Sequence, residues 1–318
     1  MQKELGISII VCNYNADLSS ILFTLASCIK QTECDFEVLY CDDGSKNNFE
    51  KEIIAFFGKH KFSNYKMLCL EKNAGTVQNI FNGLKNSTFN FVKTIGAGDV
   101  FYSPTICKEV VSYMLENNLD YCFGDGVYFY DDGKDIRLFN LNEPAIQKPY
   151  NKETLNRETI IKNLMIYNDF ILGAALFAKK DTYVKYYEMM ASKVKYEEDA
   201  IITASIIDGA KILRFPHYCV CYEYGTGIST NSNTEFQKLL FKDKYELSKY
   251  IHEHFTNRYS KKALKIASIQ GNSKKDKIKR VLICPSKISF KSKCKKAIKV
   301  TKPQPDFGFY KTCKEISK

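Results

Sequence analysis

The first hundred residues alternate between short apolar runs and segments in which apolar residues recur every three or four positions. The apolar runs predict buried β-strands, and the segments between them predict amphipathic helices. The predicted strands cover residues 7–12, 36–41, 65–70 and 90–95, and the predicted helices cover residues 19–31, 48–57 and 76–84. Such an alternation forms right-handed βαβ units around a mostly parallel sheet. We therefore expect an α/β fold whose ligand site lies at the carboxyl ends of the strands.

The alternation loosens after residue 100. We expect helices at 105–117, 181–190 and 199–207, extended segments at 121–130 and 211–215, and an apolar segment at 171–178. The run Asp131-Asp132-Gly133 predicts a hairpin turn. Apolar residues keep helical spacing from Phe236 to Phe255, which predicts a helix that continues to about residue 269.

Charge divides the chain near residue 234. Residues 1–234 contain 24 basic and 29 acidic residues, whereas residues 235–318 contain 23 basic and 7 acidic ones. We therefore predict an α/β domain over 1–234 and a basic, mainly helical extension over 235–318. Between residues 261 and 302, fifteen basic residues face a single acid, so we expect this segment to add charge rather than core.

The basic segment has two interpretations. It is either a solvated surface or a surface that attracts anionic lipid headgroups, which would hold the chain peripherally at the inner face of a membrane. Nucleic-acid binding is not expected, because residues 1–234 are acidic overall and no finger, helix-turn-helix or RNA-binding signature is present.

Several other classes are excluded by the sequence. No apolar run approaches the roughly 18 residues that a membrane helix needs, and the first ten residues lack a secretory pattern, so we expect a cytoplasmic chain. The twelve cysteines lie mostly in apolar runs and form no C-x-x-C pair, which favours reduced core residues. His252 and His254 would point to different faces of a helix, so a histidine metal site is not expected.

A polar cluster follows each of the four predicted strands. The clusters are Asn13-Tyr14-Asn15, Asp42-Asp43-Gly44-Ser45, Asn73-Ala74-Gly75 and Gly96-Ala97-Gly98-Asp99. Parallel strands bring such clusters to one edge of the sheet. Carboxylates there repel bare phosphates, but they bind a base N–H group, a ribose hydroxyl, or a divalent cation that holds a diphosphate. The combination suggests a nucleotide-sugar ligand, although each cluster alone also fits an ordinary strand-to-helix turn.

The same segments carry a family resemblance. The matching runs are ISIIVCNYN at 7–15, VLYCDDGS at 38–45, EKNAGTVQNIFNG at 71–83 and IGAGDVF at 95–101. In their order and spacing they resemble the inverting family 2 glycosyltransferases, which have the GT-A fold. The likeness covers roughly residues 5–230, and it implies that residues 1–234 are a GT-A catalytic domain with a nucleotide-sugar donor.

The resemblance implies roles for residues on the donor side. It places the donor nucleotide against Cys12, Tyr14, Asn15, Asp43, Asn73 and Gly75. It makes Asp99 the ligand of a divalent cation, Mn²⁺ or Mg²⁺, on the donor diphosphate. Where the family usually has two or three acids, this chain has glycine at 96 and 98. Asp99 is then a single carboxylate ligand, and phosphate oxygens and waters must complete the coordination.

The resemblance also implies an acceptor side. The family has an acidic group in this region that ends in the general base, which is Asp199 in the run Glu197-Glu198-Asp199. It further implies contacts to donor or acceptor from Glu198, Gly173, Ser229 and Thr230. Without the resemblance, the acidic run would equally fit the first turn of a helix, where acids complement the helix dipole.

Two functions of different classes follow. The first is an inverting glycosyltransferase of the hexosyltransferase type that moves a sugar from a UDP-sugar to a hydroxyl of a cell-surface glycan or a lipid-linked acceptor. The second is a catalytically silent relative that binds a nucleotide sugar or a glycan as an assembly partner, for which the glycines at 96 and 98 argue. A nucleotidyltransferase is disfavoured, because the run after the first strand is neither glycine-rich nor basic, as a phosphate-binding loop would be.

Overall fold

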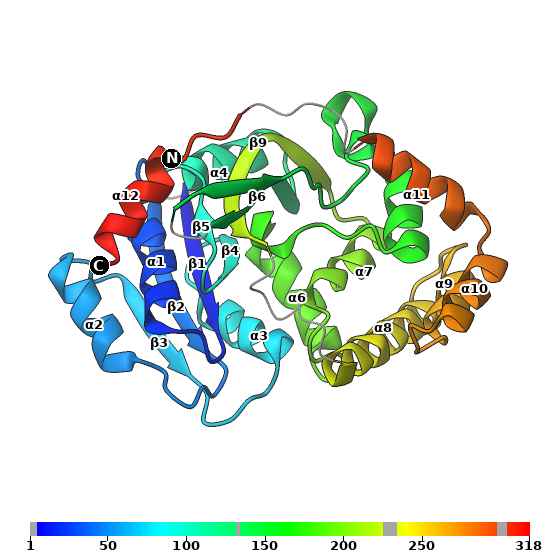
Figure 1. Cartoon of the computed structure of the whole chain (residues 1–318), viewed down its shortest axis with the longest axis horizontal. Coiled ribbons are helices and arrows are strands. Elements are labelled where there is room, and N and C mark those ends of the chain that lie inside the picture. Colours follow the sequence, from blue (N-terminus) through cyan, green and yellow to red (C-terminus); the bar gives the residue numbers. More distant parts are fainter. Residues whose placement is uncertain (1–4, 132–133, 225–233, 298–303) are drawn as a thin grey trace.

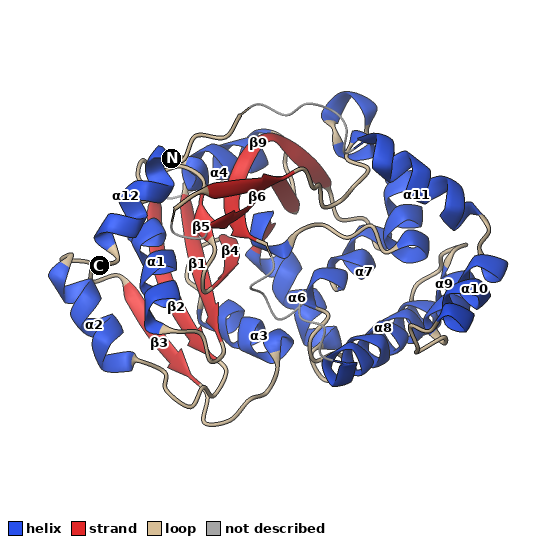
Figure 2. Ribbon diagram, in the orientation of Figure 1, coloured by secondary structure: helices blue, strands red, loops and turns tan. Residues whose placement is uncertain are grey.

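The computed structural model describes residues 5–131, 134–224, 234–297 and 304–318. Four strands near the amino terminus pair in parallel, as predicted: β1 (Gly6–Asn13), β2 (Asp35–Asp42), β3 (Tyr65–Cys69) and β4 (Phe91–Gly96). The remaining strands are β5 (Val100–Phe101), β6 (Tyr121–Asp131), β7 (Ile136–Phe139), β8 (Leu176–Lys179) and β9 (Ile212–Glu223). Within the described residues they form a nine-stranded sheet of order β3-β2-β1-β4-β8-β6-β9-β5, with β7 beside β6 (Figure 2).

Both faces of the sheet are covered, because side chains alternate along each strand. In β1, Ile7 and Ile9 join the core on one face and Ile10 joins the core on the other. The first face is covered by α1 (Leu18–Ile29), α2 (Glu50–Lys59) and α4 (Ile106–Glu116). The second face is covered by α3 (Thr76–Asn86), α5 (Arg157–Lys162), α6 (Lys180–Met190) and α7 (Ile202–Ile207). This layering leaves the carboxyl ends of the parallel strands as the edge where polar residues meet.

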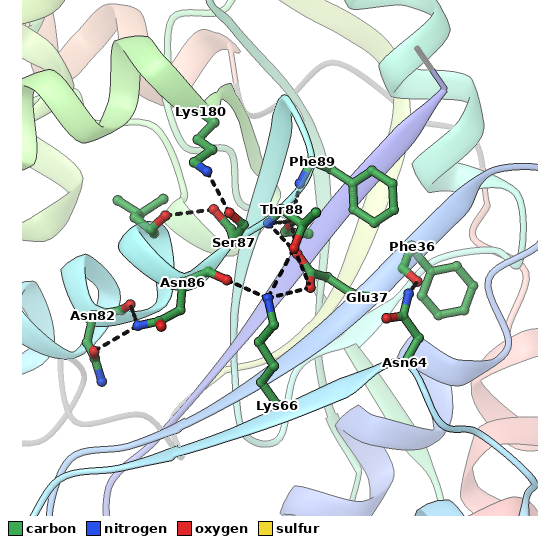
Figure 3. A network of polar contacts seen from close by, with 12 residues as sticks. Phe36, Glu37, Asn64, Lys66, Asn82, Asn86, Ser87, Thr88, Phe89 and Lys180 are labelled. Atoms are coloured by element: carbon green, nitrogen blue, oxygen red, sulfur yellow. Dashed lines mark hydrogen bonds and ion pairs between the residues drawn. The ribbon is translucent and has the colours of Figure 1, made fainter. Parts of the chain in front are cut away.

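A buried acid lies at the opposite ends of the parallel strands, away from the polar clusters. Glu37 of β2 accepts hydrogen bonds from the Ser8 hydroxyl (2.7 Å) and the Thr88 hydroxyl (3.1 Å), and it pairs with the Lys66 ammonium at 3.0 Å (Figure 3). These partners come from β1, β3 and the turn before β4. Because the donors satisfy the buried carboxylate, the network holds the register of the four parallel strands at the end away from the polar clusters.

The central part of the chain follows the expected elements with three differences. The strand expected at 211–215 continues to Glu223, since β9 pairs with both β6 and β5 and gains ladder hydrogen bonds on two sides. The segments at 171–178 and 199–207 each open with a 3₁₀ turn, Gly173–Ala175 and Glu198–Ala200, before β8 and α7 begin. The hairpin turn expected at 131–133 includes residues 132 and 133, which are outside the described ranges; the strands β6 and β7 pair in antiparallel orientation.

The prediction of one helix from 236 to about 269 was wrong. The structure has α8 (Thr234–His254) and α9 (Ser260–Ala267), joined by a turn in which the Ser260 hydroxyl donates to the Asn257 carbonyl (2.9 Å). The turn folds α9 back onto α8, so that Ala263 and Ile266 join the same core as Leu247. Hydrophobic periodicity continues across the break because both helices bury an apolar face against one core.

The rest of the basic segment contains α10 (Lys274–Ile283) and α11 (Ser286–Ala297), neither of which buries a residue, as expected for a segment that adds charge. The expectation fails for Cys284, which lies between them, and for one side of α9, where Ala263 and Ile266 are buried. The last helix, α12 (Gly308–Ile316), returns to lie beside α1 (Figure 1). There the ring centroids of Tyr310 and Phe23 lie 4.9 Å apart. The division at residue 234 stays a prediction, and it does not describe α12.

Two further expectations concern the whole chain. All twelve cysteines carry free thiols, and eight of them are buried, as expected for core residues. Among the helices in the described ranges, none combines the length and the apolar character that crossing a membrane requires.

Candidate functional site

The parallel register brings the four polar clusters together. Asn13 lies beside Asp42 in the β1–β2 pair, and Cys12 lies beside Gly96 in the β1–β4 pair. The amide of Asn13 donates to Asp42 Oδ1 (2.6 Å), and the Ser45 hydroxyl donates to the same oxygen (2.6 Å). Sequence reasoning assigned no role to these side chains, which tie the end of β1 to the turn after β2.

Tyr14 and Asn15 sit on this tied turn. Asn15 has a left-handed backbone with φ of 55°, its N–H donates to Ser45 Oγ (2.8 Å), and its side-chain oxygen accepts the N–H of Lys46 (3.0 Å). Tyr14 is 42% exposed, which is unusual for a ring of its size. The predicted nucleoside residue Tyr14 is therefore free to contact a ligand, whereas Asn15 already holds the turn.

Asp43 binds the loop after β3. Its buried carboxylate accepts hydrogen bonds from the Asn73 amide (2.9 Å), the Ala74 N–H (2.7 Å) and the Gly75 N–H (2.9 Å). Burial raises the pKa of Asp43, and the two backbone hydrogen bonds oppose that rise. Asp43, Asn73 and Gly75, predicted to line the donor pocket, thus contact one another, and much of the accepting capacity of Asp43 is used within the chain.

The loop after β3 also contacts the acidic run. Gly75 has φ of 97°, and a Cβ placed there would lie 2.2 Å from Lys195 Cγ. The Val77 N–H donates to the carbonyl of Lys195 (3.1 Å). Only glycine allows this approach, so Gly75 joins the donor side of the site to the segment that leads into Glu197, Glu198 and Asp199.

The acidic run is held by α8. Asp243 Oδ2 accepts the backbone N–H groups of Lys195 (2.9 Å), Tyr196 (2.5 Å) and Glu197 (3.3 Å). The next residue, Lys244, pairs with the buried carboxylate of Glu197 at 3.0 Å. Asp243 was not predicted from the sequence. The one indication of its role was its place as an acidic residue on the buried side of an amphipathic helix.

Asp199 lies against Gly173. A Cβ at Gly173 would lie 2.1 Å from Asp199 Oδ1, so the carboxylate occupies the space that any other residue would fill. Burial raises the pKa of Asp199 to about 7; Glu143 and Glu197 add to the rise, while Lys244 and Lys93 oppose it. A carboxylate with a pKa near neutrality is suited to accept a proton. The structure thus brings together two residues that were predicted separately.

Glu198 faces the end of β1. Burial and then Asp199 hold the pKa of Glu198 well above its usual range. Burial and then Glu198 raise the pKa of the Cys12 thiol to about 12, which keeps that thiol protonated. Cys12, predicted on the donor side, therefore lies close enough to the acidic run to interact with it electrostatically, and its protonated thiol is a poor nucleophile.

Asp99 sits in a turn fixed by α1. The Thr24 hydroxyl donates to the Asp99 carbonyl (2.8 Å) and accepts the Gly98 N–H (2.8 Å), and Gly98 has φ of 104°. A Cβ at Gly96 would lie 3.4 Å from Asp99 Oδ2. Burial raises the pKa of Asp99 to about 7, and the Lys93 ammonium opposes the rise. Asp99 is therefore placed at the edge where β4 ends, as predicted.

Lys93 is a site residue that sequence reasoning missed. It lies in β4 with no solvent exposure, and its ammonium donates to the carbonyl oxygens of Ala174 (2.7 Å) and Thr94 (2.5 Å). Burial lowers its pKa to about 8, and Asp99 is the largest charge that opposes the fall. The available signal was a lysine inside an otherwise apolar strand. A buried ammonium near the two carboxylates Asp99 and Asp199 reduces the negative charge that a diphosphate would meet.

The described residues do not form a complete cation site. No group of three or more His, Cys, Asp or Glu side chains in the described ranges could hold a metal ion. Asp99 is a single carboxylate beside a lysine, so a divalent cation fits here only if donor phosphates supply further ligands. Ser229 and Thr230, predicted to contact the donor or the acceptor, lie outside the described residues.

Comparisons with known proteins agree with this arrangement. The sequence profile described as Glycosyl transferase family 2 matches residues 8–175. The Escherichia coli protein WfgD, named a UDP-Glc:alpha-D-GlcNAc-diphosphoundecaprenol beta-1,3-glucosyltransferase, is 29% identical over 119 residues. That match covers 37% of this chain and 45% of WfgD, so the chain spans less than half of that relative.

Solved structures show the same fold. S. aureus TarS 1–349 in complex with UDP-GlcNAc matches with a TM-score of 0.59 and 16% identity, over 89% of this chain and 81% of that one. The mannosyltransferase PcManGT from Pyrobaculum calidifontis in complex with GDP-Man and Mn²⁺ matches with a TM-score of 0.54 and 12% identity, over 98% and 83%. The expected GT-A fold and the helical carboxyl-terminal region are thus confirmed. Because the profile covers just over half of the 318 residues, the chain belongs to glycosyl transferase family 2.

Proposed function

We propose that this chain is an inverting glycosyltransferase that moves a sugar from a UDP-sugar to a hydroxyl group of a lipid-linked glycan, with Asp199 as the general base. One observation carries the proposal: the strand-end clusters lie close to the buried carboxylate of Asp199. Asp199 contacts Gly173, and burial raises its pKa to about 7. The activity for which WfgD is named supports a UDP-sugar donor and a lipid-linked acceptor, and the UDP-GlcNAc complex of TarS supports the donor.

The donor is proposed to bind across the ends of β1, β2 and β4. Tyr14 is exposed and can contact the base, while Asp43 holds the loop after β3 in the shape that faces the nucleoside. Asp99, just after β4, is proposed to face the diphosphate, and the buried Lys93 ammonium is proposed to act behind it as a compensating charge. UDP is preferred over GDP because WfgD is named for a UDP-sugar and TarS was solved with UDP-GlcNAc, whereas PcManGT alone of these was solved with GDP-Man.

In the proposed reaction, Asp199 accepts the proton of the acceptor hydroxyl as that oxygen attacks C1 of the sugar. The C1–O bond to the diphosphate breaks on the opposite side, so the configuration at C1 inverts. General-base help of this kind contributes about 10²- to 10⁴-fold to the rate. Lys93, which donates to the Ala174 carbonyl, is proposed to keep Asp199 deprotonated near neutral pH by its charge.

A divalent cation is proposed to bind only when the donor diphosphate is present to supply part of its coordination. When bound, it would neutralise the charge that develops on the leaving diphosphate. Asp99 is the residue proposed to hold it, with phosphate oxygens and waters as the other ligands. The Mn²⁺ in the PcManGT complex supports this assignment.

The test is calorimetric titration of the protein with UDP, GDP, CMP and dTDP, in Mn²⁺ and again in EDTA. We expect UDP to bind, and chelation to weaken binding. Transfer is then assayed with UDP-glucose and a GlcNAc-diphosphate lipid, the pair that WfgD's name suggests. Binding of UDP that is equal in EDTA would remove the cation from the proposal, and binding of none of the four would remove the donor site.

One observation favours a second candidate, a catalytically silent partner. Gly96 and Gly98 stand where the family usually has acids, and the described residues offer no cluster of metal ligands. The double variant Asp99→Ala/Asp199→Ala distinguishes the two functions. Loss of transfer in the variant supports the enzyme, whereas full biological activity without these carboxylates supports the silent partner.

A further inference from the structure

A cavity of about 370 Å³ lies among the carboxyl-terminal helices. Its apolar floor is formed mainly by α8, α9 and the segment after α5. The floor residues are Leu164, Met165, Leu247, Ile251, Ala263 and Ile266. One side consists of residues from α10 and α11. Figure 2 shows these helices together at the end of the molecule away from β3. The volume falls in the range of about 300–1,000 Å³ that is usual for small-ligand sites.

The rim of the cavity is strongly basic. Its lining includes Lys244, Lys277, Arg280, Lys287 and Lys291 and contains no acid. Lys244 pairs with Glu197, and the Arg280 guanidinium donates to the Ile269 carbonyl (2.7 Å). Lys277, Lys287 and Lys291 have no ion pair among the described residues. Burial lowers the pKa of Lys287, and the neighbouring cations Arg280 and Lys291 lower it further, so an anion bound among these three groups would relieve their repulsion.

A polar group also faces the floor without a partner. Thr203 of α7 lines the cavity and is 3% exposed, and its hydroxyl finds no hydrogen-bond partner among the described residues. Buried hydroxyl groups normally have a hydrogen-bond partner, so Thr203 gives the cavity lining a group that can bind a polar atom of a ligand.

The helices beside the cavity expose apolar side chains. Ile278, Leu282 and Ile288 are 59%, 74% and 64% exposed, which makes them the three most exposed large apolar side chains in the described part of the chain. Ile288 also lines the cavity. Exposed apolar side chains among lysines suit a surface that touches the headgroup region of a membrane.

The cavity adjoins the proposed catalytic residues. Ala200, which follows Asp199 directly, is part of its wall. Lys244 lines the cavity and also holds Glu197, two residues before Asp199. A ligand with its anionic group at the basic rim would therefore place whatever it carries close to the proposed general base.

We propose that this cavity binds the diphosphate and the first isoprenoid units of the lipid-linked acceptor. The phosphates lie among Lys277, Lys287 and Lys291, the chain segment lies on the apolar floor, and the rest of the lipid stays in the membrane beside Ile278 and Leu282. The inference rests on the proposed function and adds to it the means by which the acceptor is recognised. A diphosphate lipid is the occupant that matches both the charge and the apolar floor.

The experiment uses farnesyl diphosphate as a short, soluble probe and inorganic diphosphate as its phosphate-only counterpart. Both are titrated into the full chain and into the double variant Lys287→Gln/Lys291→Gln. The matched control is Lys293→Gln/Lys295→Gln, which removes the same charge from α11 at positions outside the cavity. We expect farnesyl diphosphate to bind more tightly than diphosphate, and the first variant alone to weaken it at least about tenfold.

A second pair of variants tests the floor. Ala267→Phe fills the cavity, whereas Ser268→Phe adds the same ring at an exposed neighbour outside it. We expect only Ala267→Phe to lose farnesyl diphosphate, with unchanged circular dichroism for both. Equal weakening by the two charge variants, or equal affinity for farnesyl diphosphate and diphosphate, would overturn the proposal.

UDP binding separates this inference from the proposed function. All four variants should bind UDP like the unmodified chain, because none of the substituted residues lies at the strand ends. In transfer assays, Lys287→Gln/Lys291→Gln should raise KM for the lipid acceptor and leave KM for the UDP-sugar unchanged. If UDP fails to bind, the proposed function fails while lipid binding stays measurable; if UDP binds and the variants bind the lipid normally, the cavity assignment alone fails.

Discussion

At the scale of single residues, the contact between Gly173 and Asp199 leaves no room for a larger side chain at position 173. A Cβ at position 173 would lie 2.1 Å from Asp199 Oδ1, so Gly173→Ala must displace the carboxylate. We expect the turnover number to fall by about 10² or more, since the proposed proton acceptor would be displaced, while UDP affinity stays unchanged. Steady-state kinetics and calorimetry measure the two quantities.

The control for this variant is Gly58→Ala. A Cβ at Gly58 in α2 meets no atom within 4 Å, so the substitution should keep activity and raise the free energy of unfolding by roughly 0.5–1 kcal/mol. Normal turnover in Gly173→Ala would show that Asp199 does not need its observed position.

Asp199 should also set the pH dependence. A general base is active when deprotonated, so activity should fall as pH drops through about 7. Asp199→Asn should abolish transfer and keep UDP binding.

The raised pKa of Asp199 should also affect stability. The folded-state pKa lies above the ordinary value of 3.8, so between about pH 4 and 7 the folded protein holds a proton that the unfolded chain has lost. Stability therefore falls as pH rises through this range. Asp199→Asn should therefore raise Tm at pH 8 more than at pH 5; no difference between the two would contradict the raised pKa.

Lys93 is predicted to act as a positioning residue through its charge. Its ammonium opposes the rise in the pKa of both Asp99 and Asp199, so Lys93→Met should move the acidic limb of the pH–rate profile to higher pH. The loss of rate should be largest near pH 7 and smaller near pH 8.5. Lys108→Met, which removes a surface lysine of α4, serves as the control. An unshifted limb would show that Lys93 has only a structural role.

At the scale of elements, α8 is the part of the basic extension that shapes the site. Asp243 accepts three backbone N–H groups of residues 195–197, and these donors would be left unsatisfied in Asp243→Ala. We expect a loss of about 1–3 kcal/mol in the free energy of unfolding and a drop in turnover, with UDP binding retained. Glu253→Ala removes an exposed acid of the same helix and should change neither. Normal turnover in Asp243→Ala would show that α8 is not needed to position the acidic run for transfer.

The elements also show what the sequence could and could not predict. The strands of the first hundred residues and their polar ends follow from local periodicity, so Asp43 and Asp99 could be placed at one edge without a structure. The contact of Gly75 with Lys195, and that of Asp243 with residues 195–197, depend on segments far apart in the chain, so no local pattern contains them. The break between α8 and α9 was missed because both helices bury apolar faces of the same period.

At the scale of the whole molecule, charge is distributed so that one end is basic. Residues 235–297, which include nearly all of α8 to α11, carry 18 basic and 5 acidic residues, while residues 1–234 are acidic overall. Within the basic end, Lys293, Lys295 and Lys296 of α11 lie outside the cavity, and Ile278 and Leu282 are exposed nearby on α10. This arrangement supports the proposal that the basic end faces an anionic membrane, with the cavity open to lipids beside it.

The last prediction separates the membrane surface from the cavity. In sedimentation with phosphatidylglycerol vesicles, the chain should bind at low salt and dissociate as salt rises, since screening shortens to about 10 Å at 0.1 M. Lys293→Gln/Lys295→Gln/Lys296→Gln should weaken partitioning roughly a hundredfold, at about 1 kcal/mol for each lysine near the surface. Farnesyl diphosphate binding should not change. The matched triple Lys51→Gln/Lys59→Gln/Lys108→Gln on α2 and α4 should bind vesicles normally, and equal losses in both triples would show that only net charge matters.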